Sequence, residues 1–178
     1  METIEVVKKG FRELLEAMPY DKITVMSICR SASISKKTFY KYFASKPEIV
    51  QAIYYDDFIV PILELNRLLP LQNVKSAPTL ITERDFKTLF ENRKIYLNLL
   101  ENYGRMQFID LIIQNTESSC LKTMSSSGLS ELDLEFSAYF IAATSAMIKI
   151  RWMEGGFKES PETMTKLLNT WVVYRQDY

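Results

Sequence analysis

The chain of 178 residues contains no histidine. Histidine is the commonest general base and the commonest transition-metal ligand, so its absence removes the usual centre of acid–base or metal chemistry. The two cysteines, Cys29 and Cys120, lack the paired spacing of a zinc site or a disulfide framework. We expect both to be buried thiols. No catalytic residue, cofactor or metal site is predicted.

Glycine is scarce, and long apolar runs are missing. Four of the five glycines fall at predicted helix breaks, and no alternating apolar pattern indicates a strand. No stretch approaches the roughly 18 uncharged apolar residues of a membrane helix. The first residues also lack the apolar centre of a signal peptide. The sequence therefore predicts an all-α, cytoplasmic protein with no membrane partner.

Charge is balanced overall, with 22 basic and 22 acidic residues, which by itself argues against a nucleic-acid binder. The distribution is uneven, however. Residues 1–50 hold nine Lys/Arg and six Asp/Glu, whereas the remainder holds thirteen and sixteen. A basic end on a mildly acidic body is typical of a protein that binds DNA through that end.

Apolar periodicity and capping signals predict the helices. The predicted ranges are 3–18, 24–31, 36–42, 45–68, 82–91, 93–102, 105–124, 130–154 and 161–176, with a connector at 69–79. Helix 45–68 opens with a capping box, Ser45 and Glu48, around Pro47 in the first turn. A kink is expected at Pro61. We predict a head of residues 1–46 and a helical regulatory and dimerisation body of residues 47–178, connected by helix 45–68.

The two short helices 24–31 and 36–42, joined by a tight turn after a longer helix, predict a helix-turn-helix. In that motif the second helix enters the major groove with its N-terminal end leading. No acidic residue lies between Asp21 and Glu48, and hydroxyls and tyrosines stand among the lysines there. Cations mixed with hydrogen-bonding side chains suit a phosphate backbone. Phe39 is predicted to anchor the second helix to the head.

Residues 23–46 match the pattern ITV-x-x-I-x-x-x-A-x-I-S-K-x-T-F-Y-x-Y-F-x-x-K. This pattern resembles the TetR family of one-component bacterial regulators. Residues 152–162 add W-x-x-G-G-x-x-x-S-P-E, which is also similar to that family. Within this pattern, the short sequences I-C and T-F-Y are similar to those of regulators of dihydroxyacetone kinase operons. The resemblance implies a helix-turn-helix head on a helical body that dimerises and binds ligands.

The resemblance also implies roles for individual residues. Thr24 and Lys46 would hold phosphates at helix starts, and the start of helix 36–42 would face the groove. The family usually has glycine where Ser33 stands, so a positive φ there would store about 1 kcal/mol of strain. The implied DNA contacts are Thr24, Ser35, Lys36, Lys37, Thr38, Tyr40, Lys41, Tyr42 and Lys46. The alternative is a solvated lysine face with tyrosines that serve only packing.

Helix 130–154 is apolar on two sides, which predicts that both sides are covered. We expect it to pair, together with helix 161–176, with the same helices of a second copy in a four-helix bundle. The predicted interface residues are Phe136, Tyr139, Ala143, Met147, Ile150, Leu167, Leu168 and Trp171. The alternative is one deeply buried helix in a monomer.

A ligand pocket in the body is implied by the resemblance alone. Its predicted lining is Tyr96, Leu100, Tyr103, Met106, Phe108, Ile112, Phe140 and Trp152. These side chains equally fit a plain core. No basic cluster stands among them, so a small apolar or aromatic ligand is expected.

The sequence thus predicts a homodimeric, sequence-specific DNA-binding transcriptional regulator, with an operator in double-stranded DNA as its partner. A repressor released by a small molecule is expected. The alternative is a coactivator or interaction protein of the same fold that acts through another regulator without its own operator. An enzyme is excluded because no phosphate-binding glycine loop, nucleophile elbow or metal constellation is present.

Overall fold

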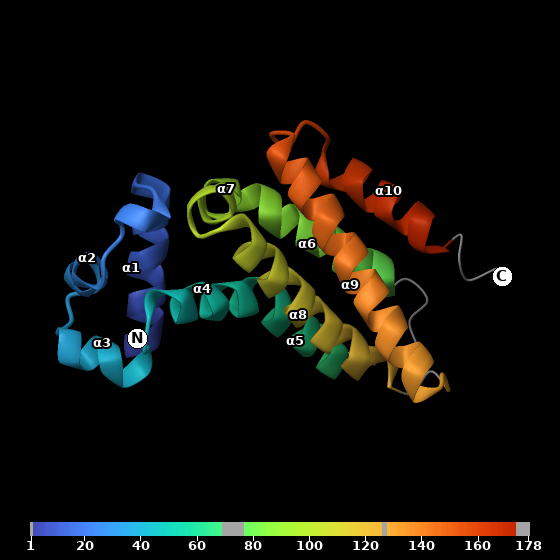
Figure 1. Ribbon diagram of the computed structural model, residues 1–178, viewed down its shortest axis with the longest axis horizontal. Coiled ribbons are helices and arrows are strands. Elements are labelled where there is room, and N and C mark those ends of the chain that lie inside the picture. Colours follow the sequence, from blue (N-terminus) through green and yellow to red (C-terminus); the bar gives the residue numbers. More distant parts are fainter. Residues whose placement is uncertain (1, 69–76, 126–127, 174–178) are drawn as a thin grey trace. The chain divides into compact units, whose positions relative to one another are not determined.

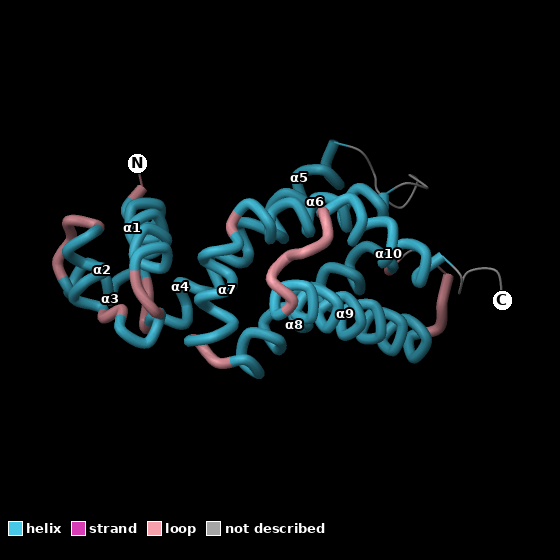
Figure 2. Tube along the Cα trace, turned by 90° about the horizontal axis from the view of Figure 1, so that it is seen from above, coloured by secondary structure: helices cyan, strands magenta, loops and turns pink. Residues whose placement is uncertain are grey.

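The computed structural model describes residues 2–68, 77–125 and 128–173, and these residues form helices without a strand (Figure 1). Figure 2 shows the same chain as helices joined by loops and turns. The α-helices are α1 (Thr3–Ala17), α2 (Val25–Ser31), α3 (Lys36–Tyr42), α4 (Lys46–Tyr54), α5 (Val60–Leu68), α6 (Ala77–Glu91), α7 (Arg93–Asn102), α8 (Arg105–Met124), α9 (Glu131–Glu154) and α10 (Pro161–Val173). The all-α prediction is confirmed. No helix within the described ranges is long and apolar enough to cross a membrane.

Local sequence signals explain several helix ends. Met18 is extended at the end of α1, as expected before Pro19. The side chains of Thr24, Ser35 and Ser130 cap α2, α3 and α9 by accepting a backbone N–H three residues on.

The predicted capping box at the start of α4 is wrong, because Ser45 and Glu48 do not make the hydrogen bonds of that motif. The Ser45 side chain makes no capping hydrogen bond, although Pro47 stands in the first turn as predicted. The Glu48 carboxylate instead accepts from the backbone N–H of Ala44 at 2.8 Å. The carboxylate therefore reaches one residue further back than in a capping box.

Helix α6 begins at Ala77, five residues before the predicted start. Pro78 lies in its first turn, where the missing proline N–H removes no helical hydrogen bond. Residues 69–76 of the predicted connector and residues 174–176 of the last predicted helix lie outside the described part of the chain.

The predicted helix 45–68 is interrupted. Between α4 and α5 the chain makes a π-helical turn, Tyr55–Ile59 (labelled η2). In a regular α-helix the N–H of residue 61 would bond to the carbonyl of Asp57, but Pro61 has no N–H and its ring would clash with that carbonyl. A widened turn relieves this conflict, so the irregularity precedes Pro61 by half a turn or more.

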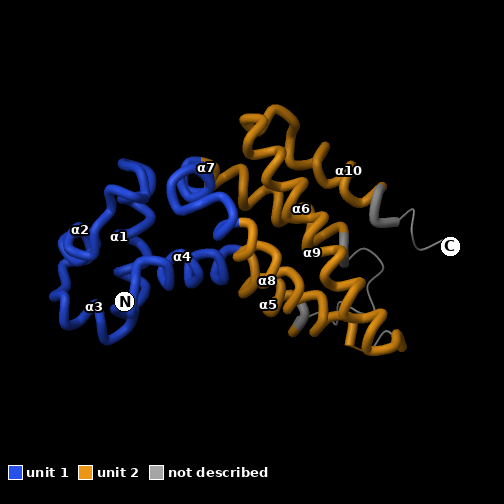
Figure 3. The backbone as a smooth tube through the Cα atoms, in the orientation of Figure 1, with its two compact units in different colours: residues 1–57, 94–108 blue, residues 58–93, 109–178 orange. Residues whose placement is uncertain are grey.

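The chain divides into two compact units, which Figure 3 colours separately. Unit 1 comprises Met1–Asp57 and Lys94–Phe108, and unit 2 comprises Phe58–Arg93 and Ile109–Tyr178. The predicted head, residues 1–46, lies inside unit 1. Unit 1 also holds α4 and most of α7, so its core draws on a helix far along the chain.

Each unit has its own core. In unit 1 the apolar face of α1 is fully buried with side chains from the other helices of the head, among them Val7, Phe11, Ile28 and Phe39. Val7 and Phe11 lie one turn apart on α1, and Ile28 and Phe39 each turn one short helix toward the same core.

In unit 2 the small side chains Ala138, Ala142 and Ala146 form a fully buried row on α9. Trp152 is 3 % exposed and packs edge-on against Phe86, with ring centroids 5.3 Å apart. Its indole N–H donates to the carbonyl of Glu159 at 3.1 Å, which fixes the loop between α9 and α10. The described part of α10 packs against α6.

Candidate nucleic-acid interface

The α2–turn–α3 segment is held by reciprocal caps. The Thr24 hydroxyl accepts from the N–H of Ser27 at 3.0 Å, and the Ser27 hydroxyl accepts from the N–H of Thr24 at 3.0 Å. The Ser35 hydroxyl accepts from the N–H of Thr38 at 3.0 Å, and the two side-chain oxygens lie 2.9 Å apart. These bonds fix where both helices begin, and hence the direction in which α3 presents its first turn.

The turn itself contains a strained residue. Ser33 has φ of 53°, in the left-handed region that glycine adopts most easily. The sequence left open whether this position needs a positive φ, and the structure shows that it has one. Its N–H donates to the carbonyl of Arg30 at 3.2 Å, and the N–H of Ile34 donates to Cys29 at 2.9 Å. The turn is thus closed by backbone bonds despite the strain.

The predicted contacts on α3 form an exposed polar face. Phe39 is completely buried and turns the opposite face of the helix into the core. Thr38 is half-buried, and the remaining members are exposed: Ser35, Lys36, Lys37, Tyr40, Lys41 and Tyr42. Among the described residues no carboxylate pairs with the lysines of α3. Within the described part of the chain, these positive charges are therefore not neutralised by an ion pair.

Two predicted phosphate contacts have additional partners. The hydroxyl oxygen of Thr24 is used as the α2 cap, although the residue is exposed. The Lys46 ammonium donates to the carbonyls of Tyr20 at 2.6 Å and Ile23 at 2.8 Å, and lies 3.7 Å from the centre of the Tyr20 ring. Burial lowers the pKa of Lys46, against the opposing charge of Asp21. Lys46 thus ties α4 to the segment between α1 and α2, a role that the sequence did not predict.

A helix from later in the chain supports the head. On α7, the Asn98 amide donates to the carbonyls of Leu15 at 2.6 Å and Met18 at 2.7 Å, and its oxygen accepts from the N–H of Tyr20 at 2.8 Å. Asn98 therefore satisfies the open end of α1. Sequence reasoning missed this residue, although an asparagine within an apolar helix was a usable signal.

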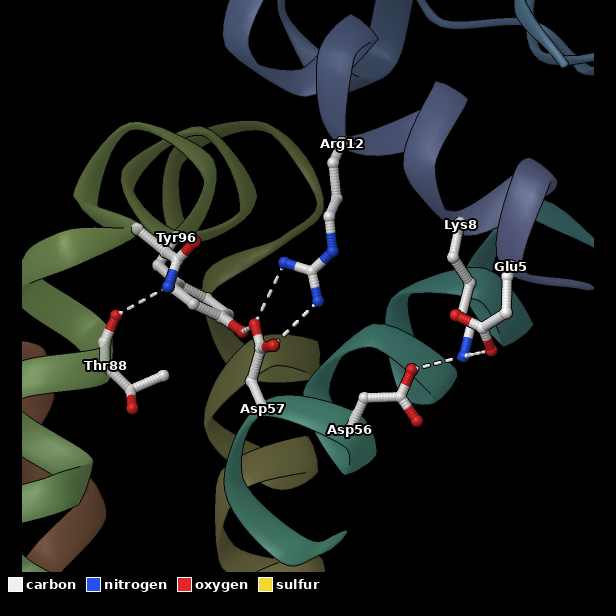
Figure 4. A network of polar contacts seen from close by, with 8 residues as sticks. Glu5, Lys8, Arg12, Asp56, Asp57, Thr88 and Tyr96 are labelled. Carbon is white, nitrogen blue, oxygen red and sulfur yellow. Dashed lines mark hydrogen bonds and ion pairs between the residues drawn. The ribbon is translucent and has the colours of Figure 1, made fainter. Parts of the chain in front are cut away.

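The second support is an ionic cluster around Asp57 (Figure 4). The Arg12 guanidinium donates to both carboxylate oxygens of Asp57, at 3.0 and 2.7 Å. The hydroxyl of Tyr96, which is completely buried, donates to the same carboxylate. Lys8 pairs with Asp56 and, at 2.5 Å, with Glu5. We call Arg12, Asp57 and Tyr96 the Asp57 cluster.

The ionisation of the Asp57 cluster follows from its surroundings. Burial lowers the pKa of Arg12, but the hydrogen bonds and charge of Asp57 outweigh burial and raise it overall. Burial, reinforced by the charge of Asp57, raises the pKa of Tyr96 well above its usual value. Tyr96 is therefore a neutral donor at physiological pH, and Arg12 stays charged.

The residues predicted for the dimer interface differ in exposure. Phe136, Tyr139, Met147 and Leu167 are between 45 % and 64 % exposed, and Ala143 is half-buried. Ile150 and Leu168 are buried within the chain, and the Trp171 side chain lies outside the described part. Leu132 and Phe140 add to the exposed group, at 64 % and 44 %. These exposed apolar side chains lie mainly along α9, a face that we call the α9 apolar face.

The residues predicted for the pocket do not all lie in one unit. In unit 1, Tyr96, Leu100 and Phe108 are buried, Tyr103 is half-buried, and Met106 is 59 % exposed. In unit 2, Ile112 and Trp152 are buried, and Phe140 is exposed. The ring of Tyr96 stacks on that of Phe108, with centroids 6.1 Å apart. Tyr96 and Trp152 thus pack in separate aromatic groups.

Unit 2 contains a buried ion pair that the sequence analysis missed. The Lys149 ammonium, 2 % exposed as a side chain, donates to Asp85 Oδ2 at 2.5 Å. Asp85 Oδ1 is buried with no hydrogen-bond partner within the described residues. Cys120 lies near this pair. Burial raises the pKa of its thiol to about 11, with Lys149 lowering it in part. Cys29 is buried and Cys120 half-buried, both as free thiols.

Comparison with known proteins agrees with this geometry. Residues 10–53 match the family described as bacterial regulatory proteins, tetR family, and residues 77–173 match a transcriptional regulator C-terminal region. The HTH-type dhaKLM operon transcriptional activator DhaS of Lactococcus lactis subsp. lactis (strain IL1403) is 34 % identical over 56 residues, which span 32 % of this chain and 30 % of that protein.

A solved structure, the dihydroxyacetone kinase operon activator DhaS, shares the fold. It aligns over 97 % of this chain and 95 % of its own, with a TM-score of 0.68 and 20 % sequence identity. The matches to the head and the body together cover most of the described residues. The chain belongs to the TetR family of bacterial transcriptional regulators, as its helix-turn-helix pattern predicted.

Proposed function

We propose that this protein is a homodimeric, sequence-specific regulator that binds an operator in double-stranded DNA. The exposed face of α3 carries the proposal, because its lysines have no carboxylate partner among the described residues and its first turn is fixed by the Ser35 cap. Phosphate contacts supply affinity, and side chains at the start of α3 read bases. Lys37 and Thr38 are the proposed base readers. Binding to the chromosome implies a cytoplasmic location.

The α9 apolar face supports the homodimer. Large apolar side chains that are 44 % to 64 % exposed recur along α9, so the lone chain leaves an apolar surface in water. A second copy covers it with the same surface in a two-fold arrangement. Ile150 and Leu168 are buried within the chain, so we propose that they support this surface from beneath.

We propose repression relieved by a small molecule as the mode of regulation. An apolar or aromatic ligand remains the expectation, although the buried Lys149–Asp85 pair adds polar groups to the body. Activation is the second candidate, because both relatives are named as operon activators. A coactivator without its own operator is a form of that second candidate. A promoter–reporter fusion in cells with and without the gene distinguishes repression from activation.

Gel-shift titration against salt tests DNA binding. We expect Tyr40→Phe to weaken binding to all duplexes, and Lys37→Ala to change which sequence is preferred. Each lost ionic phosphate contact flattens the slope of log K against log salt by about 0.9. The matched control is Lys158→Ala, which removes an exposed lysine of unit 2. It should change neither the affinity for DNA nor the preferred sequence.

The salt titration can also contradict the proposal. If the purified protein has no affinity for any genomic fragment at low salt and without ligand, the chain has no operator of its own. The coactivator alternative would then replace it. Unchanged sequence preference in Lys37→Ala and Thr38→Val would overturn the assignment of base readers alone.

A further inference from the structure

The chain passes between the two units three times, at 57/58, 93/94 and 108/109. Any change in unit 2 that reaches α3 along the backbone must enter unit 1 at one of these points. Side chains at each crossing belong to one connected group. Asp57 is the last residue before the first crossing, Tyr96 lies three residues after Arg93, and Phe108 is the last residue before the third.

These three residues are connected by direct contacts. Tyr96 donates its hydroxyl to Asp57 and stacks its ring on Phe108. Asp57 in turn receives two hydrogen bonds from Arg12 on α1 (Figure 4). Helix α1 packs against α2, which in turn packs against α3, and its apolar side chains belong to the same core. Residues at the three crossings are therefore linked to the central helix of the head through one carboxylate.

The carboxylate is presented by the widened turn. Asp56 and Asp57 both lie in the π-helical turn Tyr55–Ile59, and both pair with α1, Asp56 with Lys8 and Asp57 with Arg12. Lys8 and Arg12 stand four residues apart, so they lie on one face of α1. π-Helical turns are rare and occur frequently at functional sites. This turn places two neighbouring carboxylates against two successive turns of the same helix.

Charge and burial make the contact specific. The side chain of Arg12 is 25 % exposed and that of Asp57 16 %, and the pair is bidentate. Bidentate guanidinium–carboxylate pairs fix orientation as well as distance. Tyr96 occupies a further position on the same carboxylate, so a small rotation of Asp57 would break bonds to two helices at once.

We propose that Arg12, Asp57 and Tyr96 are positioning residues that set the orientation of the head for operator binding. This inference rests on the proposed function. The Asp57 cluster touches no DNA. It holds α1 at the points where the chain leaves and re-enters unit 1, so that the two α3 helices of a dimer meet two half-sites at the correct spacing. Loss of the cluster loosens that orientation while each head remains intact.

Comparison of a whole operator with a single half-site tests this role. The operator is first selected with the wild-type protein, and binding is measured to the full duplex and to a half-site duplex at low salt. A positioning defect lowers the advantage of binding two half-sites at once but leaves each half-site contact unchanged. We expect Asp57→Asn and Tyr96→Phe to lower full-site affinity at least tenfold and half-site affinity less than twofold.

The matched control is Asp85→Asn, which breaks a buried ion pair in unit 2. The affinity of this variant for the full-site duplex and for the half-site duplex should each lie within twofold of the wild-type affinity. Tyr96→Phe removes only one hydroxyl, so it provides the test if Asp57→Asn does not fold.

Two outcomes would overturn the positioning role. One is full-site affinity of Tyr96→Phe within twofold of wild type, and the other is an equal fall for both duplexes, which indicates a merely structural role. A wild-type protein that binds no operator would overturn the proposed function and this inference together.

Discussion

Helices α3 and α9 both expose side chains along one face, but of opposite kinds. On α3 the exposed residues are lysines, hydroxyls and tyrosines, whereas on α9 they are Leu132, Phe136, Tyr139, Phe140 and Met147. The polar and basic side chains of α3 match the chemistry of a polyanion, whereas the apolar side chains of α9 match a surface that excludes water. The two surfaces therefore respond differently to solution conditions, which makes them separable by experiment.

The helices also differ in what lies beneath the exposed face. Helix α3 has seven residues and depends on Phe39, the Ser35 cap and its packing against α2. Helix α9 has 24 residues and a continuous row of buried alanines. Short isolated helices are marginal in water. The orientation of the exposed α3 face therefore depends on the packing of the rest of unit 1.

Salt should separate the two surfaces most strongly. Between 50 and 200 mM salt we expect operator affinity to fall by about 1000-fold, because a protein with six or more phosphate contacts releases that many counterions. Association through the α9 apolar face should change less than threefold, since apolar burial is not weakened by salt. Fluorescence anisotropy and light scattering on the same samples measure both. If dimerisation and DNA binding weakened to the same extent as salt rises, the two surfaces would not differ in the way described.

A charge on the α9 apolar face should have the next largest effect. Phe136→Glu places a carboxylate on each copy of a two-fold interface, where burial without a partner is costly. We expect the dimer to weaken by roughly 100-fold, measured by sedimentation. The control Leu63→Glu alters a leucine on α5 that is 40 % exposed, and it should leave the dimer intact. A fully dimeric Phe136→Glu variant would show that α9 is not the interface.

The strained turn should give the smallest effect. Ser33→Gly removes the Cβ from a residue with φ of 53°, so we expect the free energy of unfolding to rise by about 1 kcal/mol. Ser33→Ala keeps the Cβ and should bring no gain. Urea unfolding followed by circular dichroism measures both variants. If Ser33→Gly is no more stable than wild type, the turn bonds of Arg30 and Cys29 already compensate the strain.

Much of the fold could be predicted from local signals. Caps at Thr24, Ser35 and Ser130 and the proline after Met18 act within a few residues, so the sequence displays them directly. The positive φ of Ser33 was predictable because the resembled family has glycine there. The exposed face of α3 followed from the single buried position of Phe39.

Contacts between distant residues could not be predicted in the same way. Asn98 binds the end of α1 across about 80 positions, and Lys149 meets Asp85 across 64. A single sequence gives no information on which polar residue of one helix faces which of another. Lys46 was predictable as a cation at a helix start, but its bonds to Tyr20 and Ile23 depend on tertiary packing.

The π-helical turn before Pro61 also has a consequence for how the chain tolerates change in length. Each residue of an α-helix advances the side-chain direction by about 100°. Inserting or deleting one residue between Tyr55 and Asp57 would therefore rotate the Asp57 carboxylate away from Arg12, however conservative the residue chosen. Substitutions along much of this helix keep the position of Asp57. A change in its length there would break the contact between Asp57 and the Arg12 guanidinium.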